Sequence, residues 1–144
     1  MKWVTREHPK TDRIACPWLI RKFIDPDAEI VYVAAAEVLG YAEREGAISF
    51  DAPGARYTHR GNKCSFETLI DEYKVDDPAI PIMARVVHGA DIGEDRGATP
   101  ESAGLLAIAD GFALLELDDQ RQLKLELPVY DALYAWAKNQ LRDP

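Results

Sequence analysis

The chain has 144 residues, of which 47% are apolar and 29% are charged, and its formal net charge is −8. These values are typical of one globular domain, and they argue against general nucleic-acid binding because phosphate backbones select basic surfaces. No apolar run approaches the roughly 20 residues that span a bilayer, and the N-terminus lacks the apolar core of a signal peptide. We therefore expect a single cytoplasmic domain over residues 1–144, with no membrane or nucleic-acid partner.

The N-terminal half predicts short strands joined by a helix. Lys2–Arg6 and Glu29–Ala34 are rich in β-branched and aromatic residues, which favour extended backbone. The helix expected between them covers Asp12–Ile24, so the chain starts with a β–α–β unit that allows one parallel strand pair. Ile48–Phe50 and Arg56–His59 flank a turn signal, which predicts a hairpin or a sharp bend.

The start of the first helix decides the environment of Cys16. If Thr11 or Asp12 caps the helix, Pro17 lies about one turn inside it and removes a helix hydrogen bond. If the regular helix begins at Pro17, the proline takes its preferred first position and Cys16 becomes the N-cap. Free backbone N–H groups and the positive end of the helix dipole then lower the pKa of the thiol. We favour this second register.

The C-terminal half predicts helices opened by prolines. Asp77-Pro78 supplies a cap and a first-turn proline, and opens a helix that reaches about Asp91. Thr99-Pro100 opens a second helix through Ala109 or beyond, and Pro128 opens the last one. The predicted fold class is therefore α+β, with a small N-terminal mixed sheet, a β–α–β start and a helical C-terminal half.

A cationic cluster surrounds one thiol near the N-terminus. Cations beside Cys16 favour the thiolate, which is the nucleophile and the metal ligand, whereas the simpler alternative is a small buried apolar side chain. Arg13 and Arg21 would lie on neighbouring faces of one helix and converge on an anion, or else form a solvated basic face. The other cations of this segment are Arg6, His8, Lys10 and Lys22.

The segment Thr58–Glu67 predicts a strand–loop–helix junction with Ser65 as the N-cap. Backbone N–H groups at such junctions hold anions. His59 and Cys64 are also potential metal ligands, although a structural zinc site needs four. The alternative is a loop with a capping serine and a buried cysteine, and a disulfide between Cys64 and Cys16 stays open.

A third polar group is the pair His88 and Asp91. Their spacing of three residues places both side chains on one face of a helix that is otherwise apolar. This polar face meets water, or Asp91 simply orients His88, or the two residues bind a metal ion with Glu67 or His59 completing the set. Histidine and carboxylate ligands together suit iron, manganese or zinc.

A family resemblance rests on five phrases: TREHPKTDRIACPWLIRKFID, CSFETLIDEY, HGAD, GLLAIADG and PVYDALYAW. The chain resembles, from about Lys2 to Lys138, the chromate-resistance protein family, which includes the C-terminal domain of the chromate-responsive regulator ChrB. The resemblance implies a bacterial cytoplasmic protein linked to chromate stress. The regulator form carries an additional DNA-binding region and some relatives carry a sulfurtransferase domain; since neither is found in these residues, we expect no DNA binding by this chain alone.

The leading functional hypothesis is a chromate-resistance domain that binds a small dianionic oxyanion, namely chromate. Arg13, Arg21 and Arg60 would supply positive charge and fork-shaped donors for the substrate. Cys16 and Cys64 would be the catalytic thiols, because thiolates donate electrons and can be oxidised in steps. The domain would then be a chromate reductase or a redox sensor.

Two other hypotheses come from different classes. In the first, His59, Glu67, His88 and Asp91 bind one transition-metal ion, either iron, manganese or zinc, in a mononuclear redox or hydrolytic enzyme. In the second, the domain senses chromate without catalysis and changes its affinity for a partner. The sequence leaves open whether the polar clusters meet, which metal is bound, and whether the chain forms a homo-oligomer.

Overall fold

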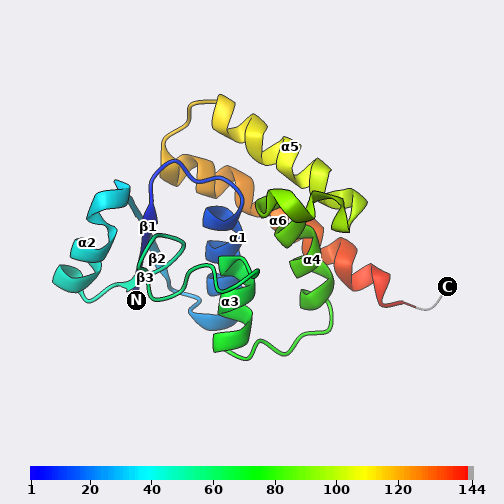
Figure 1. Cartoon of the computed structure of the whole chain (residues 1–144), viewed down its shortest axis with the longest axis horizontal. Helices are drawn as coiled ribbons and strands as arrows, with labels where there is room; N and C mark the ends of the chain where they lie inside the picture. Colours follow the sequence, from blue (N-terminus) through cyan, green and yellow to red (C-terminus); the bar gives the residue numbers. More distant parts are fainter. Residues whose placement is uncertain (143–144) are drawn as a thin grey trace.

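The fold is built on a three-stranded, fully parallel sheet, which Figure 1 shows beside a layer of helices. The structure is a computed structural model, and it describes residues 1–142. β1 (Lys2–Arg6) is the central strand, with β2 (Glu29–Val33) on one side and β3 (Ile48–Ser49) on the other. The predicted β–α–β start and helical C-terminal half are confirmed, while the small sheet is wholly parallel and not mixed.

The sheet separates two apolar clusters of unequal size. Successive side chains of a strand point to opposite faces. Trp3 and its register partner Ile30 accordingly belong to the large core, on the side of α1 (Asp12–Leu19). Val4 belongs to a small cluster with Val38 of α2. Helices α2 and α1 therefore lie on opposite sides of the sheet (Figure 1).

The strand order creates a switch point between β1 and β3. The connection through α1 leads from β1 to β2. The next connection runs through a 3-10 turn (Ala35–Glu37) and α2 (Val38–Glu45), passes β1 and adds β3 to its other edge. Where the direction of strand addition reverses in this way, a crevice opens at the carboxyl ends of the strands and is the usual ligand site of open α/β sheets. Arg6 ends β1 at this edge, and Asp51 follows β3 there.

The first helix starts earlier than the register we favoured. It begins at Asp12, with Thr11 in the N-cap position, and it continues as a π-helical turn over Ile20–Ile24. The two parts together cover the predicted span, but the prediction that the regular helix begins at Pro17 is wrong. Cys16 consequently lies inside α1, fully buried, and not at a helix N-terminus.

A contact from β2 explains how α1 tolerates its internal proline. Pro17 has no N–H, so the carbonyl of Arg13, four residues earlier, loses its helical donor. The hydroxyl of Tyr32 donates to that carbonyl at 2.6 Å. The missing hydrogen bond is therefore replaced by one from a neighbouring strand.

The remaining helices are α3 (Ser65–Glu72), α4 (Ile80–Asp91), α5 (Pro100–Leu114) and α6 (Asp119–Gln140), with a 3-10 segment at Gly93–Ala98. Of these helices, α3, α4 and α6 contact α1, whereas α5 packs against α4. The Thr99 cap of α5 is confirmed, since its hydroxyl accepts the Ser102 N–H at 3.1 Å. The prediction that Pro128 opens the last helix is wrong: Asp118 caps α6 and Pro128 lies within it.

The chain between β3 and α3 bends sharply. Asp51 has a φ of 45°, and the N–H of Ala55 donates to Ala52 O at 2.9 Å, which closes the turn. Of the predicted strand Arg56–His59, only Tyr57 pairs, in an isolated parallel bridge to Phe50. Within the part of the chain that the structure describes, no helix combines the length and apolar character needed to cross a membrane.

Candidate functional site

A cluster of charged side chains lies at the carboxyl edge of β1 and β3, where the fold has its switch point. Its members come from the end of β1, the first turn of α1, the bend after β3, the loop before α3 and the last turn of α4. We call it the switch-point cluster, and it consists of Arg6, Asp12, Arg13, Asp51, His59 and Asp91.

Asp51 holds the two arginines of the cluster. Its side chain is 5% exposed, and its Oδ2 lies 3.3 Å from Nη1 of Arg13 and 3.4 Å from Nη2 of Arg6. Its Oδ1 accepts a hydrogen bond from the Ser65 hydroxyl at 2.7 Å. Burial works to raise the pKa of Asp51, but hydrogen bonds from His59 and Ser65 and the two guanidinium charges outweigh it, so the pKa is lowered. Asp51 is therefore a carboxylate that fixes its neighbours.

His59 is the meeting point of three carboxylates. Its Nε2 lies 3.1 Å from Asp91 Oδ2, 3.5 Å from Asp51 Oδ1 and 3.6 Å from Asp12 Oδ2. One ligand atom from each of Asp12, His59 and Asp91 lies within 4.8 Å of the others. The side chain of His59 is 46% exposed, so the group is open to solvent on this side. Hydrogen bonds to Asp12 and Asp51 raise the pKa of His59 to about 10.

Asp12 is the most buried of these ligands. Its side chain is 1% exposed, and Oδ2 accepts the backbone N–H of Ser65 at 2.8 Å. The other oxygen, Oδ1, is buried and has no hydrogen-bond partner among residues 1–142. Burial raises the pKa of Asp12 to about 7, against the lowering effect of His59. A buried carboxylate oxygen without a partner costs about 1–3 kcal/mol, so this position is suited to a cation.

The donor set of the switch-point cluster fits a divalent metal ion. Carboxylate oxygens and an imidazole nitrogen are typical ligands of manganese, iron and zinc. Without a metal ion, the charge of the three carboxylates is balanced by two arginines and by the proton on His59. Metal ligands must be deprotonated, so a dication would take the place of the proton on His59.

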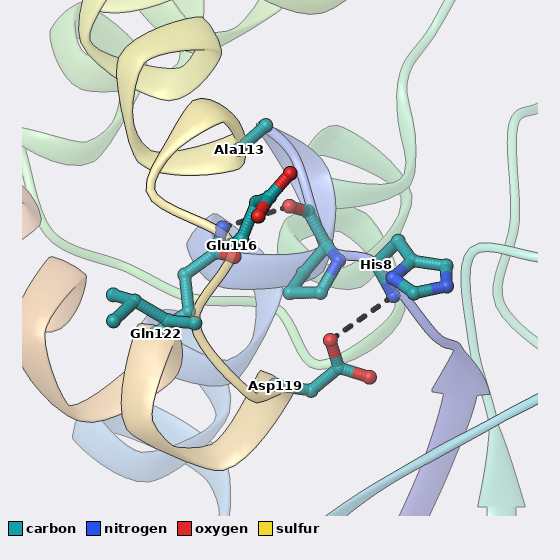
Figure 2. A pocket seen from close by; sticks show the side chains of 7 residues that line it. His8, Ala113, Glu116, Asp119 and Gln122 are labelled. Carbon is teal, nitrogen blue, oxygen red and sulfur yellow. Dashed lines mark hydrogen bonds between the residues drawn. The ribbon is translucent and has the colours of Figure 1, made fainter.

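The loop between β1 and α1 also lines a pocket of about 250 Å³, which Figure 2 shows between that loop and the corner joining α5 to α6. The backbone N–H of His8 donates to Asp119 Oδ1 at 3.2 Å, and Nε2 of Gln122 donates to Pro9 O at 2.9 Å. These contacts fasten α6 to the loop that delivers Asp12. The pocket and the switch-point cluster are lined by different residues, so the pocket is not part of that cluster.

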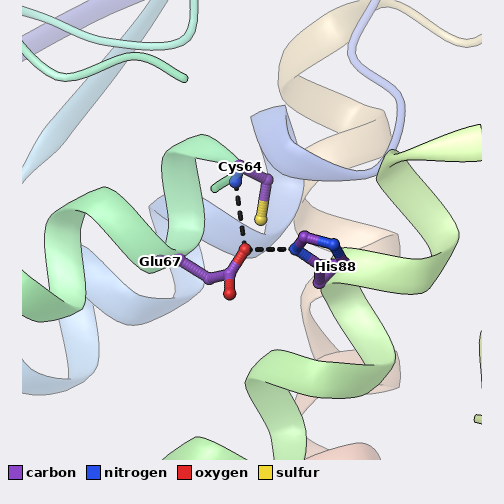
Figure 3. A group of neighbouring side chains, drawn as sticks. All are labelled: Cys64, Glu67 and His88. Atoms are coloured by element: carbon purple, nitrogen blue, oxygen red, sulfur yellow. Dashed lines mark hydrogen bonds and ion pairs between the residues drawn. The ribbon is translucent and has the colours of Figure 1, made fainter. Parts of the chain in front are cut away.

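A second group of potential ligands lies between α3 and α4 (Figure 3). Cys64 is the N-cap of α3, Glu67 lies in its first turn, and His88 projects from α4. One ligand atom from each lies within 4.8 Å of the others. Oε1 of Glu67 accepts the Cys64 N–H at 3.0 Å and lies 2.5 Å from Nδ1 of His88. We call these three residues the α3–α4 group.

The structure divides the four predicted metal ligands between the two groups. His59 and Asp91 lie together at the switch point, whereas Glu67 and His88 lie together in the α3–α4 group. The groups adjoin, because His88 and Asp91 are one helical turn apart on α4. The sequence predicted a single set of four ligands. In the structure, His59 in the loop before α3 contacts Asp91 at the end of α4, whereas Glu67 in α3 contacts His88 one turn earlier.

Comparison with known proteins gives the family. A family model described as "ChrB, C-terminal domain" matches residues 3–137. The chain belongs to this family. It is 34% identical over 136 residues to Protein ChrB of Cupriavidus metallidurans, an alignment that covers 92% of this chain and 40% of that protein. The chain therefore spans less than half the length of this relative, and no solved structure matches it.

In this ChrB-family domain the two candidate thiols are buried. Cys16 and Cys64 are both 0% exposed and unbridged in the described part of the chain. Burial raises the pKa of both thiols, and the nearby charge of Asp12 raises it further. This is the opposite of the activation that we expected from an N-cap position of Cys16. The N-cap of α3 is Cys64, one residue before the predicted Ser65.

The three predicted substrate arginines of the ChrB domain have different partners. Arg13 contacts Asp51 in the switch-point cluster. Arg21 donates from Nε to the carbonyl of Ala28 at 3.1 Å, and Arg60 forms an exposed ion pair with Glu72. Each guanidinium thus makes its own local contact.

Sequence reasoning missed two acidic members of the switch-point cluster. Asp12 opens α1 directly after the β1 loop, and Asp51 directly follows the β3 region. Acidic residues at the carboxyl ends of adjacent parallel strands are a signal for a shared site. That signal was available only once β3 was known to pair with β1.

Proposed function

We propose that this domain acts in chromate resistance as a metal-binding domain, in which Asp12, His59 and Asp91 hold one divalent transition-metal ion at the switch point. The single observation that carries the proposal is that Asp12, His59 and Asp91 each offer a ligand atom within 4.8 Å of the others. The buried Oδ1 of Asp12, which has no hydrogen-bond partner in residues 1–142, adds support. Membership of the ChrB family supports the link to chromate resistance. The spacing of the three ligand atoms supports the binding of a metal ion.

The charges of the cluster favour a cation over a free oxyanion. Arg6 and Arg13 are already engaged by Asp51, so a dianion placed here would meet three carboxylates. A bound dication reverses the sign of the field at its open positions, and a metal ion of this kind supplies Lewis-acid chemistry. Chromate or another small oxyanion would then bind beside the arginines as a ligand of the metal centre.

Ser65 positions the ligands. Its backbone N–H donates to Asp12 at 2.8 Å, while its hydroxyl donates to Asp51 at 2.7 Å. One residue therefore orients both the buried ligand and the carboxylate that holds the arginines. Such supporting hydrogen bonds typically contribute 10–100-fold to metal affinity.

Direct thiol chemistry is less well supported than metal chemistry. A thiol reacts as the thiolate, which needs solvent access and a lowered pKa. Cys16 and Cys64 have neither, because both are fully buried and burial raises the pKa of each. We therefore propose that any chromate-linked activity depends on the metal centre.

The test is a titration of chelator-treated protein with Mn²⁺, followed by calorimetry and elemental analysis. The wild type is expected to bind Mn²⁺, and Asp12→Asn is expected to weaken binding by about tenfold or more. Asp110→Asn is the matched control, since it removes the same charge from an exposed side chain that pairs with Lys10. Equal Mn²⁺ affinity in Asp12→Asn and wild type would refute the proposal.

A further inference from the structure

We propose that the α3–α4 group is a second metal site, in which Cys64, Glu67 and His88 bind a borderline-soft divalent ion such as Zn²⁺. The site is separate from the switch-point cluster and shares no residue with it. This proposal adds to the proposed function a second metal ion, bound by a different set of donor atoms.

The ligands come from two helices that present them to one point (Figure 3). Cys64 and Glu67 are three residues apart at the start of α3, which places their side chains on one face. His88 faces them from α4. The three ligand atoms lie within 4.8 Å of one another. In a tetrahedral zinc site the ligand atoms are about 3–4 Å apart, so side-chain adjustments alone would complete the site.

Asp95 gives His88 the orientation of a metal ligand. Nε2 of His88 lies 2.6 Å from Asp95 Oδ2, and Nδ1 points to Glu67. Metal-binding histidines almost always donate their second ring N–H to a carboxylate, which fixes the tautomer and makes the free nitrogen a better ligand. With Asp95 accepting from Nε2, the nitrogen on the side of Glu67 and Cys64 is the one that binds the metal.

The ring of His88 lies between two carboxylates, since Nδ1 is 2.5 Å from Glu67 Oε1 and Nε2 is 2.6 Å from Asp95 Oδ2. This arrangement favours a cation on the side of Nδ1. Zn²⁺ bound there would also displace the thiol proton of Cys64, because a coordinated thiol is deprotonated outright. A buried thiol that is unreactive by itself thereby gains a role.

The site has a route to solvent. The side chains of His88 and Glu67 are 14% and 23% exposed. Glu67 also lines a pocket of about 300 Å³ together with Lys63 and Arg85. Three protein ligands beside such an opening leave a fourth position for water or another small ligand, as in zinc sites that are not purely structural.

The donor atoms separate this site from the first. Thiolate sulfur and imidazole nitrogen select zinc and similar ions, whereas the carboxylates around His59 suit harder ions such as Mn²⁺. The two sites are neighbours, because the N–H of Ser65 donates to Asp12 while Cys64 directly precedes it. Because the two groups share no residue, one site can be occupied without the other.

The experiment uses Co²⁺ as a spectroscopic probe for Zn²⁺ in chelator-treated full chain. A thiolate ligand gives Co²⁺ an intense near-ultraviolet charge-transfer band that carboxylate and imidazole ligands do not give. The wild type is expected to develop this band and to lose it on addition of Zn²⁺. Cys64→Ser is expected to abolish it, and serine preserves a favourable N-cap for α3. Cys16→Ser is the matched control and is expected to retain the band.

Further variants keep the test decisive if Cys64→Ser folds poorly. Glu67→Gln and His88→Gln are each expected to lower Co²⁺ affinity by about tenfold or more while circular dichroism shows an intact fold. Absence of the band in wild type, or its persistence in folded Cys64→Ser, would overturn the second site. A wild-type band that all ligand variants retain unchanged would do the same.

The switch-point site is tested separately by Asp12→Asn. This variant is expected to keep the Co²⁺ charge-transfer band and to bind Mn²⁺ about tenfold or more weakly. If Mn²⁺ binding fails in wild type but the band forms, only the proposed function is refuted. If Mn²⁺ binds and no band forms, only the α3–α4 site is refuted.

Discussion

The hydroxyl of Tyr32 donates to the backbone carbonyl of Arg13 at 2.6 Å, which is the carbonyl that Pro17 leaves without a helical donor. Helix α1 can therefore run unbroken from Asp12, and it delivers Asp12 and Arg13 to the carboxyl edge of the sheet. A single contact between β2 and α1 thus links the local sequence to the geometry of the switch-point cluster.

Removal of this contact should destabilise the protein. Tyr32→Phe leaves the Arg13 carbonyl without a donor, and we expect a loss of about 1–2 kcal/mol in the free energy of unfolding. Urea denaturation measures the loss, with Tyr41→Phe on α2 as the control. Pro17→Ala restores a backbone N–H, so the effect of Tyr32→Phe should shrink in that background. Equal effects in both backgrounds would show that the hydroxyl does not compensate for the proline.

The same contact explains why part of the fold was predictable and part was not. The sequence predicts strands over Lys2–Arg6 and Glu29–Ala34 because β-branched and aromatic residues mark them locally. The observed strands cover Lys2–Arg6 and Glu29–Val33. Local sequence rules favour proline at the first position of a helix, so the sequence predicts helix starts at Pro17 and Pro128. The hydrogen bond that compensates for Pro17 comes from Tyr32 on β2, outside the helix. Local sequence patterns around Pro17 therefore do not predict it.

The candidate site shows the same limit. His59, Glu67, His88 and Asp91 were chosen by residue type and spacing, and all four lie in ligand groups. Their division into two groups depends on how the loop before α3 meets α4. Asp12 and Asp51 were missed because their closeness depends on the pairing of β3 with β1. The sequence therefore predicts which residues are potential metal ligands, whereas the fold is needed to show which of them lie together.

A buried carboxyl group should make stability depend on pH. Glu126 is fully buried, and burial raises its pKa from an ordinary 4.5 to about 7, although a hydrogen bond from Gln122 opposes this. Between these two values the unfolded chain releases the proton first, so the contribution of Glu126 to stability falls as pH rises through this window. Below it, the protonated side chain carries no such penalty.

Glu126→Gln removes the titrating carboxyl group. The free energy of unfolding of this variant should differ from that of the wild type only above the ordinary pKa of 4.5. We expect similar free energies of unfolding near pH 4.5 and a gain of about 3 kcal/mol for the variant at pH 8. Chemical denaturation across this pH range measures the difference in free energy of unfolding between variant and wild type. The contributions of other titrating groups are the same in both proteins and cancel in this difference. Glu43→Gln, at an exposed position of α2, is the matched control for the loss of a carboxyl group. A pH-independent difference for Glu126→Gln would contradict the assignment.

A glycine permits the close approach of α4 and α5. A Cβ at Gly89 would lie 2.2 Å from Ser102 Oγ and 3.1 Å from Asp95 O, so Gly89→Ala forces the helices apart. We expect a loss of about 1–3 kcal/mol in stability. Gly104→Ala in exposed α5 has open space around its Cβ and should instead stabilise by up to about 1 kcal/mol. Thermal or urea unfolding that ranks the two variants the other way would contradict this packing.

The carboxylate behind His88 offers the sharpest test of orientation in the α3–α4 group. Asp95→Ala should lower Zn²⁺ affinity by about 10–100-fold, because the ring of His88 loses the acceptor of the Nε2–H that fixes its tautomer. The Co²⁺ charge-transfer band should persist at saturation, since Cys64 still binds the ion. Glu94→Gln removes a neighbouring exposed charge and should leave the affinity unchanged. Equal loss in both variants would mean that general electrostatics, and not the orientation of His88, governs binding.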